Sequence, residues 1–192
     1  MNNEHTNALT DKVTFGFWIY LMSDCVLFAG LFATYAVLHT QTFGAADISR
    51  IVNMPYVLVE TLILLTSSFT VGLALLAANA HKKNLTLAAL GATLLLGLAF
   101  LGMELHEFVQ LVAQGSGPSH SAFLSSFFVL LGTHGLHVAL GSLWMLVIMA
   151  HVFIKGLSEG TTRKLTCLAL FWHFLDIIWI FIFTFVYLFG GL

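Results

Sequence analysis

Residues 171–180 read FWHFLDIIWI, inside an apolar run that continues almost to the end of the sequence. His173 and Asp176 lie three positions apart, so they share a face if the run is helical. An ionised carboxylate near the middle of a bilayer costs about 2.5–3.5 kcal/mol on insertion scales, and such groups therefore face protein rather than lipid. The stretch indicates a transmembrane helix that packs against other protein.

The composition is that of an integral membrane protein. Of the 192 residues, 59% are hydrophobic and only 8% are charged, whereas about 25% of residues are charged in soluble domains. The formal net charge of -2 and the lack of a basic cluster argue against a nucleic-acid partner. Cys25 and Cys167 lie in or beside apolar segments, which favours small buried side chains over a disulfide or a metal site.

Five segments are long and apolar enough to cross a bilayer as helices, which takes about 20 residues. They are residues 15–39, 56–80, 85–112, 122–154 and 164–189. The expected fold class is therefore all-α, a polytopic membrane bundle of five transmembrane helices. Residues 1–14 form a polar N-terminal tail without the features of a cleaved signal peptide, and residues 15–192 form a single transmembrane domain.

The basic residues predict the orientation of this bundle. All but one of them fall on the same side of a five-span arrangement: Lys12, Lys82, Lys83, Lys155, Arg163 and Lys164. Arg50 alone falls on the opposite side. Because Lys and Arg are in excess on the cytoplasmic side of membrane proteins, we expect a cytoplasmic N-terminus and a periplasmic C-terminus.

Ionisable side chains inside the spans form the main functional candidates. With a rise of about 1.5 Å per residue, five of them lie near the middle of their spans: Asp24, His134, His137, His173 and Asp176. They come from three different spans at similar depth. We expect them to form an intramembrane polar network.

A second group of acidic residues lies closer to the outer surface. Glu60 is near the outer end of the span 56–80, and Glu104 and Glu107 are near the outer end of the span 85–112. Because these carboxyl groups share a level, they predict an outer polar cluster between the two spans.

Several functions are compatible with the mid-membrane residues. His134, His137 and His173 could ligate a haem between facing helices, or a copper or zinc ion. Asp24 and the histidines could instead form a proton relay, since intramembrane acids mark such paths. The interpretation we favour is a hydrogen-bonded network that fixes helix packing, with no chemistry of its own.

Other patterns indicate packing rather than catalysis. The span 56–80 carries a strip of small side chains, which let helices approach closely: Thr66, Ser67, Ser68, Thr70 and Gly72. Trp172 and Trp179 are seven residues apart and so share a face, which is typical of helix packing. The sequence has no Gly-rich phosphate loop, no nucleophile elbow and no H-E-x-x-H motif, and we expect no catalytic residue in it.

Motifs in every span carry a resemblance to a known family. They lie in residues 15–38, 55–68, 102–108, 127–145 and 170–190, and include HGLH at 134–137 and WHFLD at 172–176. With these motifs the chain resembles subunit III of the haem-copper oxidases, most closely the form found in bacterial cytochrome bo-type ubiquinol oxidases. The resemblance covers the sequence from Thr14 onward.

The resemblance implies a non-catalytic subunit of a respiratory, proton-pumping oxidase in the bacterial inner membrane. Its partners would be oxidase subunits I, II and IV together with bound phospholipid. Haems and copper are expected in subunit I, where electrons from ubiquinol reduce dioxygen, and no cofactor or metal is expected in this chain. The role implied for it is to support assembly, lipid binding and the stability of subunit I.

The chain departs from the family pattern in two respects. It is similar to the shorter, five-helix form, whereas relatives that oxidise cytochrome c often have seven helices. Those relatives carry a Glu within a Ser-Glu-Val context, and the matching residue here is Asp24, between Ser23 and Cys25. Since Asp is shorter by one methylene, the role of that Glu carries over only in outline.

Three alternatives to a quinol oxidase subunit remain open. The chain could be subunit III of a cytochrome c-type haem-copper oxidase, or a haem-bearing membrane cytochrome. An autonomous carrier or proton channel is a further alternative, and it would require an inverted repeat or helices broken near the middle of the membrane.

Overall fold

The structure is a computed structural model that describes residues 2–38, 54–113 and 122–188, with side chains from Lys12 onward. The described residues are helical apart from short turns, which confirms the all-α prediction. The helices are α1 (Asn2–Leu38), α3 (Met54–Asn79), α4 (Lys83–Ala113), α5 (Ala122–Lys155) and α6 (Glu159–Ile182). A wider π-helical turn, η1 (Phe183–Leu188), continues α6 to the end of the described chain.

Each predicted span corresponds to one helix. The helices long and apolar enough to cross a membrane number 5 among the described residues: Lys12–Leu38, Met54–Asn79, Lys83–Ala113, Ala122–Lys155 and Glu159–Leu188. These ranges agree with the predicted spans to within five residues, because the length of an apolar run fixes where a membrane helix begins and ends. The last predicted residues of the first and fifth spans, 39 and 189, lie outside the described residues.

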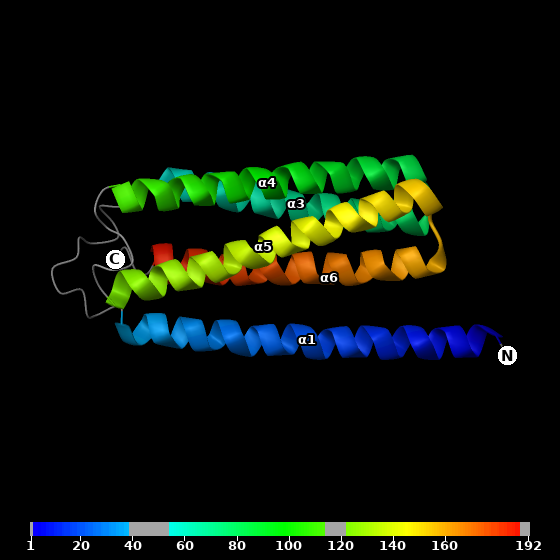
Figure 1. Ribbon diagram of the computed structural model, residues 1–192, viewed down its shortest axis with the longest axis horizontal. Coiled ribbons are helices and arrows are strands. Elements are labelled where there is room, and N and C mark those ends of the chain that lie inside the picture. Colours follow the sequence, from blue (N-terminus) through cyan, green and yellow to red (C-terminus); the bar gives the residue numbers. More distant parts are fainter. Residues whose placement is uncertain (1, 39–53, 114–121, 189–192) are drawn as a thin grey trace.

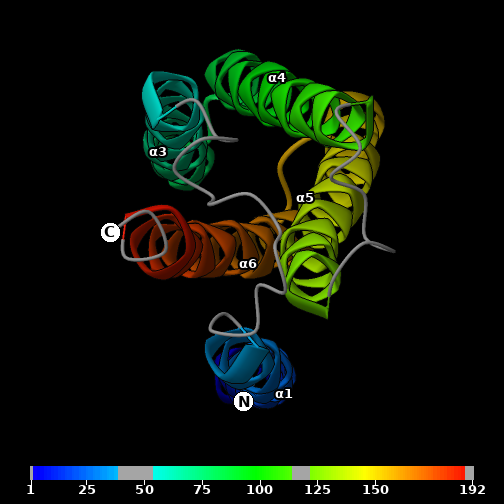
Figure 2. The ribbon, with the colours of Figure 1, turned by 90° about the vertical axis from the view of Figure 1, so that its left-hand side faces the viewer.

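The helices run side by side along the long axis of the molecule (Figure 1). Seen along that axis, α3, α4, α5 and α6 surround a common core, and α1 lies apart on the far side of α6 from α3 and α4 (Figure 2). α1 packs against α5 and α6, whereas α3 packs mainly against α4 and α6. α6 is consequently the most buried of the five spans and α1 the least.

Glycines admit the large rings of α6 into the core. A Cβ added at Gly97 of α4 would lie 2.9 Å from the ring of Trp172, and one added at Gly141 of α5 would lie 2.9 Å from Phe171 and 3.2 Å from Trp172. The two distances of 2.9 Å are too short for a real side-chain contact, and the distance of 3.2 Å is tight. Trp172, which is fully buried, therefore packs against α4 only because Gly97 has no side chain, and Gly141 leaves room for Phe171 and Trp172 beside α5.

Left-handed residues end two of the helices at the same end of the bundle. After α3, His81 has φ 55°, and the amide of Lys82 donates to the carbonyl of Ala77 at 3.0 Å, which completes a Schellman turn. After α5, Gly156 has φ 76°, and its amide donates to Val152 at 3.0 Å. Ser158 then caps α6, with its hydroxyl accepting from the amide of Thr161.

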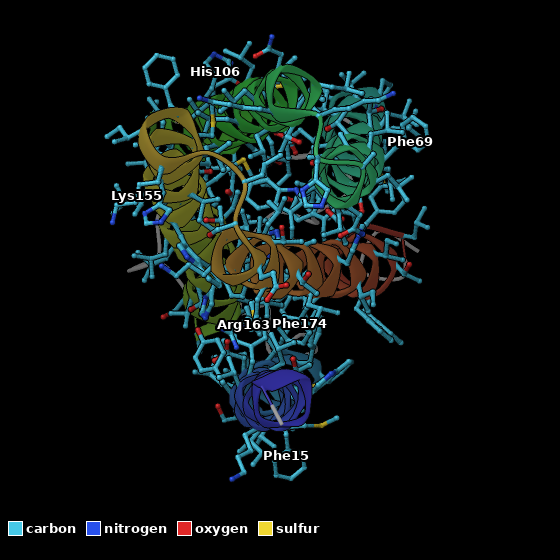
Figure 3. All side chains as sticks on the ribbon, turned by 90° about the vertical axis from the view of Figure 1, so that its right-hand side faces the viewer. Phe15, Phe69, His106, Lys155, Arg163 and Phe174 are labelled. Atoms are coloured by element: carbon cyan, nitrogen blue, oxygen red, sulfur yellow. The ribbon has the colours of Figure 1, made fainter. Side chains whose placement is uncertain are left out.

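The basic residues inside the described ranges gather at this end, as the orientation argument requires. Lys155 and Arg163 lie there (Figure 3), beside the turn that holds Lys82 and Lys83. Arg50, the counterexample in the sequence, lies outside the described residues, and the side of the membrane that each end faces stays a prediction. One prediction was wrong: Cys25 is exposed, not buried, because it lies on the outer face of α1, whereas Cys167 is buried.

Candidate functional site

The structure divides the mid-membrane residues between two places. Asp24 of α1 faces His137 of α5, with 3.8 Å between Asp24 Oδ2 and His137 Nε2. The other ring nitrogen, Nδ1, donates to the carbonyl of Thr133 at 2.7 Å. Because Nδ1 carries the proton of the neutral ring there, Nε2 and the carboxyl group attract each other only when a further proton lies on one of them. This pair joins α1 to the rest of the bundle.

His134 lies one turn from His137 but in a different environment. It is fully buried among aromatic rings, with ring centroids 5.9 Å from Phe100 and 5.2 Å from Trp179. Neither of its ring nitrogens has a hydrogen-bond partner among the described residues. His134 therefore contributes to packing between α4, α5 and α6, and the structure does not join it to the Asp24–His137 pair by a hydrogen bond.

His173 and Asp176 lie on α6, beside α3. A hydrogen bond of 2.6 Å joins His173 Nδ1 to Ser68 Oγ of α3, and Asp176 Oδ2 lies 3.9 Å from the same nitrogen. A Ser-His-Asp hydrolase needs the serine and the aspartate on opposite nitrogens of the ring. Here both face Nδ1, so the trio is not an activated nucleophile and serves to hold α3 against α6.

Two indoles extend this contact between α3 and α6. Trp172 Nε1 donates to Ser67 Oγ at 2.9 Å, and Trp179 Nε1 donates to Thr61 Oγ1 at 3.1 Å. The spacing of the two tryptophans predicts that they serve helix packing, whereas Thr61 as a partner emerges only from the structure. The spacing of the residues carries a signal for this partner. Thr61 and Ser67 are six residues apart on α3, and Trp172 and Trp179 are seven apart on α6. Because the two helices run antiparallel, each indole meets one of the two hydroxyl groups.

The carboxyl groups predicted to form the outer cluster lie near one another at one end of α3 and α4. Glu104 is within electrostatic range of Glu60 and Glu107, and all three are buried. Tyr187 of η1 donates from its hydroxyl to Glu107 Oε2 at 3.3 Å, which brings a fourth polar group that sequence reasoning missed. Neither oxygen of Glu60 has a partner among the described residues.

The packing of Glu104 depends on a glycine of the HGLH motif. A Cβ added at Gly135 would lie 2.5 Å from Glu104 Oε2. The glycine thus leaves the space that the carboxyl group fills between α4 and α5. Within the described ranges, no group of three or more His, Cys, Asp or Glu side chains is arranged to hold a metal ion.

A groove at the basic end combines positive charge with apolar surface. Its volume is about 460 Å³, and it lies between the start of the α1 span Lys12–Leu38, the later part of α5 and the start of α6. His151, Arg163 and Lys164 line it together with Phe17 and Trp144. Basic pockets between transmembrane helices at the membrane surface suit the head groups of anionic lipids.

The sequence matches one protein family along nearly its whole length. The family described as Cytochrome c oxidase subunit III matches residues 1–191. Cytochrome bo(3) ubiquinol oxidase subunit 3 of Pseudomonas aeruginosa is 56% identical over 191 residues, which are 100% of this chain and 91% of that protein.

Two further relatives show the same likeness at lower identity. Cytochrome bo(3) ubiquinol oxidase subunit 3 of Buchnera aphidicola subsp. Baizongia pistaciae is 44% identical over 93% of this chain and 92% of its own length. Probable quinol oxidase subunit 3 of Staphylococcus haemolyticus is 42% identical over 91% of this chain and 88% of its own length.

Proposed function

This chain belongs to the cytochrome c oxidase subunit III family, and we propose that it acts as the third subunit of a cytochrome bo-type ubiquinol oxidase. The observation that carries the proposal is the 56% identity to a ubiquinol oxidase subunit 3 over the whole chain. The proposal adds that this subunit works in the bacterial inner membrane, in a complex that transfers electrons from quinol to dioxygen and translocates protons.

The proposed role is structural, with no active site in this chain. Several polar side chains inside the spans join helices to one another, as in the contacts of Ser68, Thr61 and Ser67 with α6. Subunit I is the proposed site of the haems and copper, and subunits I, II and IV are the proposed partners. Support for a partner comes from α1, whose span is the least buried of the five.

Bound phospholipid is the second part of the proposal. The basic groove between α1, α5 and α6 has the charge for a phosphate group and, in Phe17 and Trp144, the apolar lining for the beginning of an acyl chain. A lipid held there would also fill the space beside α1. Mass spectrometry of the complex released from its native membrane detects such a lipid, and Lys164→Ala should lower its occupancy.

A tagged pull-down tests the proposed function. The chain is expressed in its own bacterium with a C-terminal tag, extracted in mild detergent and purified. Larger subunits, haem bands in the visible spectrum, and oxygen uptake supported by quinol are the expected result. Oxygen uptake supported by cytochrome c but not by quinol would contradict the choice of donor. A colourless chain of 21.0 kDa without partners would contradict the proposal as a whole.

A further inference from the structure

One ionisable side chain near the middle of the membrane faces outward. His173 lies close to the midpoint of the span Glu159–Leu188, and 46% of its side chain is exposed. At similar depth, Asp24, His134 and Asp176 are buried and His137 is largely covered. His173 thus differs from the other mid-membrane groups, which have protein around them.

Only one of the two ring nitrogens of His173 has a hydrogen-bond partner in the part of the chain that the structure describes. His173 Nδ1 is bonded to Ser68 Oγ at 2.6 Å, whereas Nε2 has no partner among the described residues. Hydrocarbon tails offer neither donors nor acceptors, and water is scarce at this depth. Polar side chains inside a membrane almost always face the interior of a bundle or a water-filled cavity. The exposed face of His173 therefore calls for a polar group from another molecule.

The surface around His173 has the shape of a helix-packing site. We call it the α3–α6 surface and define it by Leu65, Ser68 and Gly72 of α3 and His173 and Ile177 of α6. Leu65 and Ile177 are exposed apolar residues. A Cβ added at Gly72 would meet nothing within 4 Å, so open space lies beside it. Small residues at such positions let a second helix approach closely.

Aromatic surface borders this site. Phe69, the residue after Ser68, points away from the bundle (Figure 3), and 68% of it is exposed. The surface thus has a polar centre with apolar residues around it, as helix–helix contacts in membranes do. A lipid tail would cover the apolar part and leave His173 Nε2 without a partner.

We propose that the α3–α6 surface binds a transmembrane helix of another subunit of the oxidase, and that this helix presents a hydrogen-bonding side chain to His173 Nε2 near the middle of the membrane. The proposal rests on the proposed function, since it requires a multi-subunit complex. It adds which face of the chain makes the contact and which chemistry the partner brings.

Photo-crosslinking in the assembled complex tests the location. A benzoylphenylalanine replaces Ile177, one turn from His173 and 53% exposed, in the tagged chain. The matched control carries it at Leu136, which lies at similar depth on α5 and is 59% exposed. A protein adduct at least about tenfold more abundant from position 177 than from position 136 supports the proposal. Equal yields, or adducts with lipid alone from position 177, overturn it.

A glycine substitution tests the close approach without disturbing the fold. Gly72→Leu adds a side chain into open space, and so does the control, Gly102→Leu on α4. We expect both chains to accumulate in the membrane, and Gly72→Leu to retain at least about tenfold less partner than Gly102→Leu after purification. Equal retention by the two variants would contradict a helix packed on the α3–α6 surface.

Substitution of His173 tests the polar contact. His173→Leu removes both nitrogens, whereas His173→Gln keeps a polar group near the position of Nε2. We expect His173→Leu to lower partner retention about threefold to tenfold, as the strength of interhelical hydrogen bonds implies, and His173→Gln to restore most of it. Retention that is the same for Leu and Gln would overturn the polar contact. If the wild-type chain retains no partner at all, the proposed function itself fails.

Discussion

At the scale of single residues, the sequence predicts which ionisable side chains lie inside the spans. It does not predict toward which neighbouring helix each side chain points. Counting residues along each span predicts one level for Asp24, His137 and His173, and the structure brings Asp24 and His137 to within 3.8 Å of each other. Which of them face one another depends on how the helices are rotated, and that is decided by the packing of large rings such as Trp172 into glycine gaps. The single network predicted from the sequence therefore corresponds to two separate contacts in the structure. Asp24 faces His137, and His173 lies beside Ser68 and Asp176.

Asp176 should matter for assembly more than for redox chemistry. It is buried beside His173, and Asp176→Ala removes the carboxyl group from the contact between α3 and α6. We expect the yield of assembled complex to fall about tenfold, which corresponds to about 1.4 kcal/mol. The haem absorption spectrum of the complex that remains should be unchanged. Asp176→Asn, which keeps the shape, should lose less, and normal assembly with altered haem bands would contradict a structural role.

The glycine beside Trp172 should tolerate no side chain. Gly97→Ala places a Cβ 2.9 Å from the indole ring, and overpacking of this kind costs about 1–3 kcal/mol. Gly91→Ala, on the same helix, meets only the end of Met149 at 3.9 Å and should be neutral or stabilising by up to about 1 kcal/mol. The midpoint of detergent-induced unfolding measures both. Equal midpoints would show that Trp172 moves freely.

At the scale of helices, the sequence predicted existence and length well but missed two features. The runs of apolar residues fixed the spans, because a membrane helix must cover the hydrocarbon layer. The runs of apolar residues do not mark the continuation of α1 back to Asn2 or the point where the π-helical turn η1 begins. Neither feature alters the pattern of apolar residues from which the spans are predicted. η1 brings Tyr187 to Glu107, which explains why the tyrosine was absent from the predicted outer cluster.

The two left-handed turn residues should respond oppositely to substitution. His81 holds φ 55°, a conformation that costs a residue with a Cβ roughly 1–2 kcal/mol relative to glycine. His81→Gly should therefore stabilise the α3–α4 turn by up to about 1 kcal/mol. Gly156→Ala, at φ 76°, should destabilise the α5–α6 turn by a similar amount. Unfolding midpoints that shift in the same direction for both variants would contradict this account.

At the scale of the whole molecule, the helices argue against an autonomous carrier. Each described span is continuous through its middle, whereas carriers bind their substrates where helices are broken near the midplane. What the chain has instead is a core of four helices with a fifth, α1, attached along one side (Figure 2).

α1 should be the least protected helix when the chain is separated from its complex. Its contacts are mainly with α5 and α6, and most of its span is exposed. In the isolated chain in detergent, we expect backbone amides in residues 24–38 to exchange with deuterium at least about tenfold faster than those of α6. The difference should shrink in the assembled complex. Uniform protection of all five helices in the isolated chain would show that α1 needs no partner.

The gathering of lysines and arginines at one end also has an electrical consequence. With that end in the cytoplasm, as the positive-inside rule expects, the inside-negative voltage of a respiring cell attracts the charges of Lys12, Lys82, Lys83 and Lys155 toward the side where they already lie. Carrying one such charge across works against about 2.3 kcal/mol for every 100 mV. The voltage that an oxidase builds would thereby hold this subunit in its own orientation.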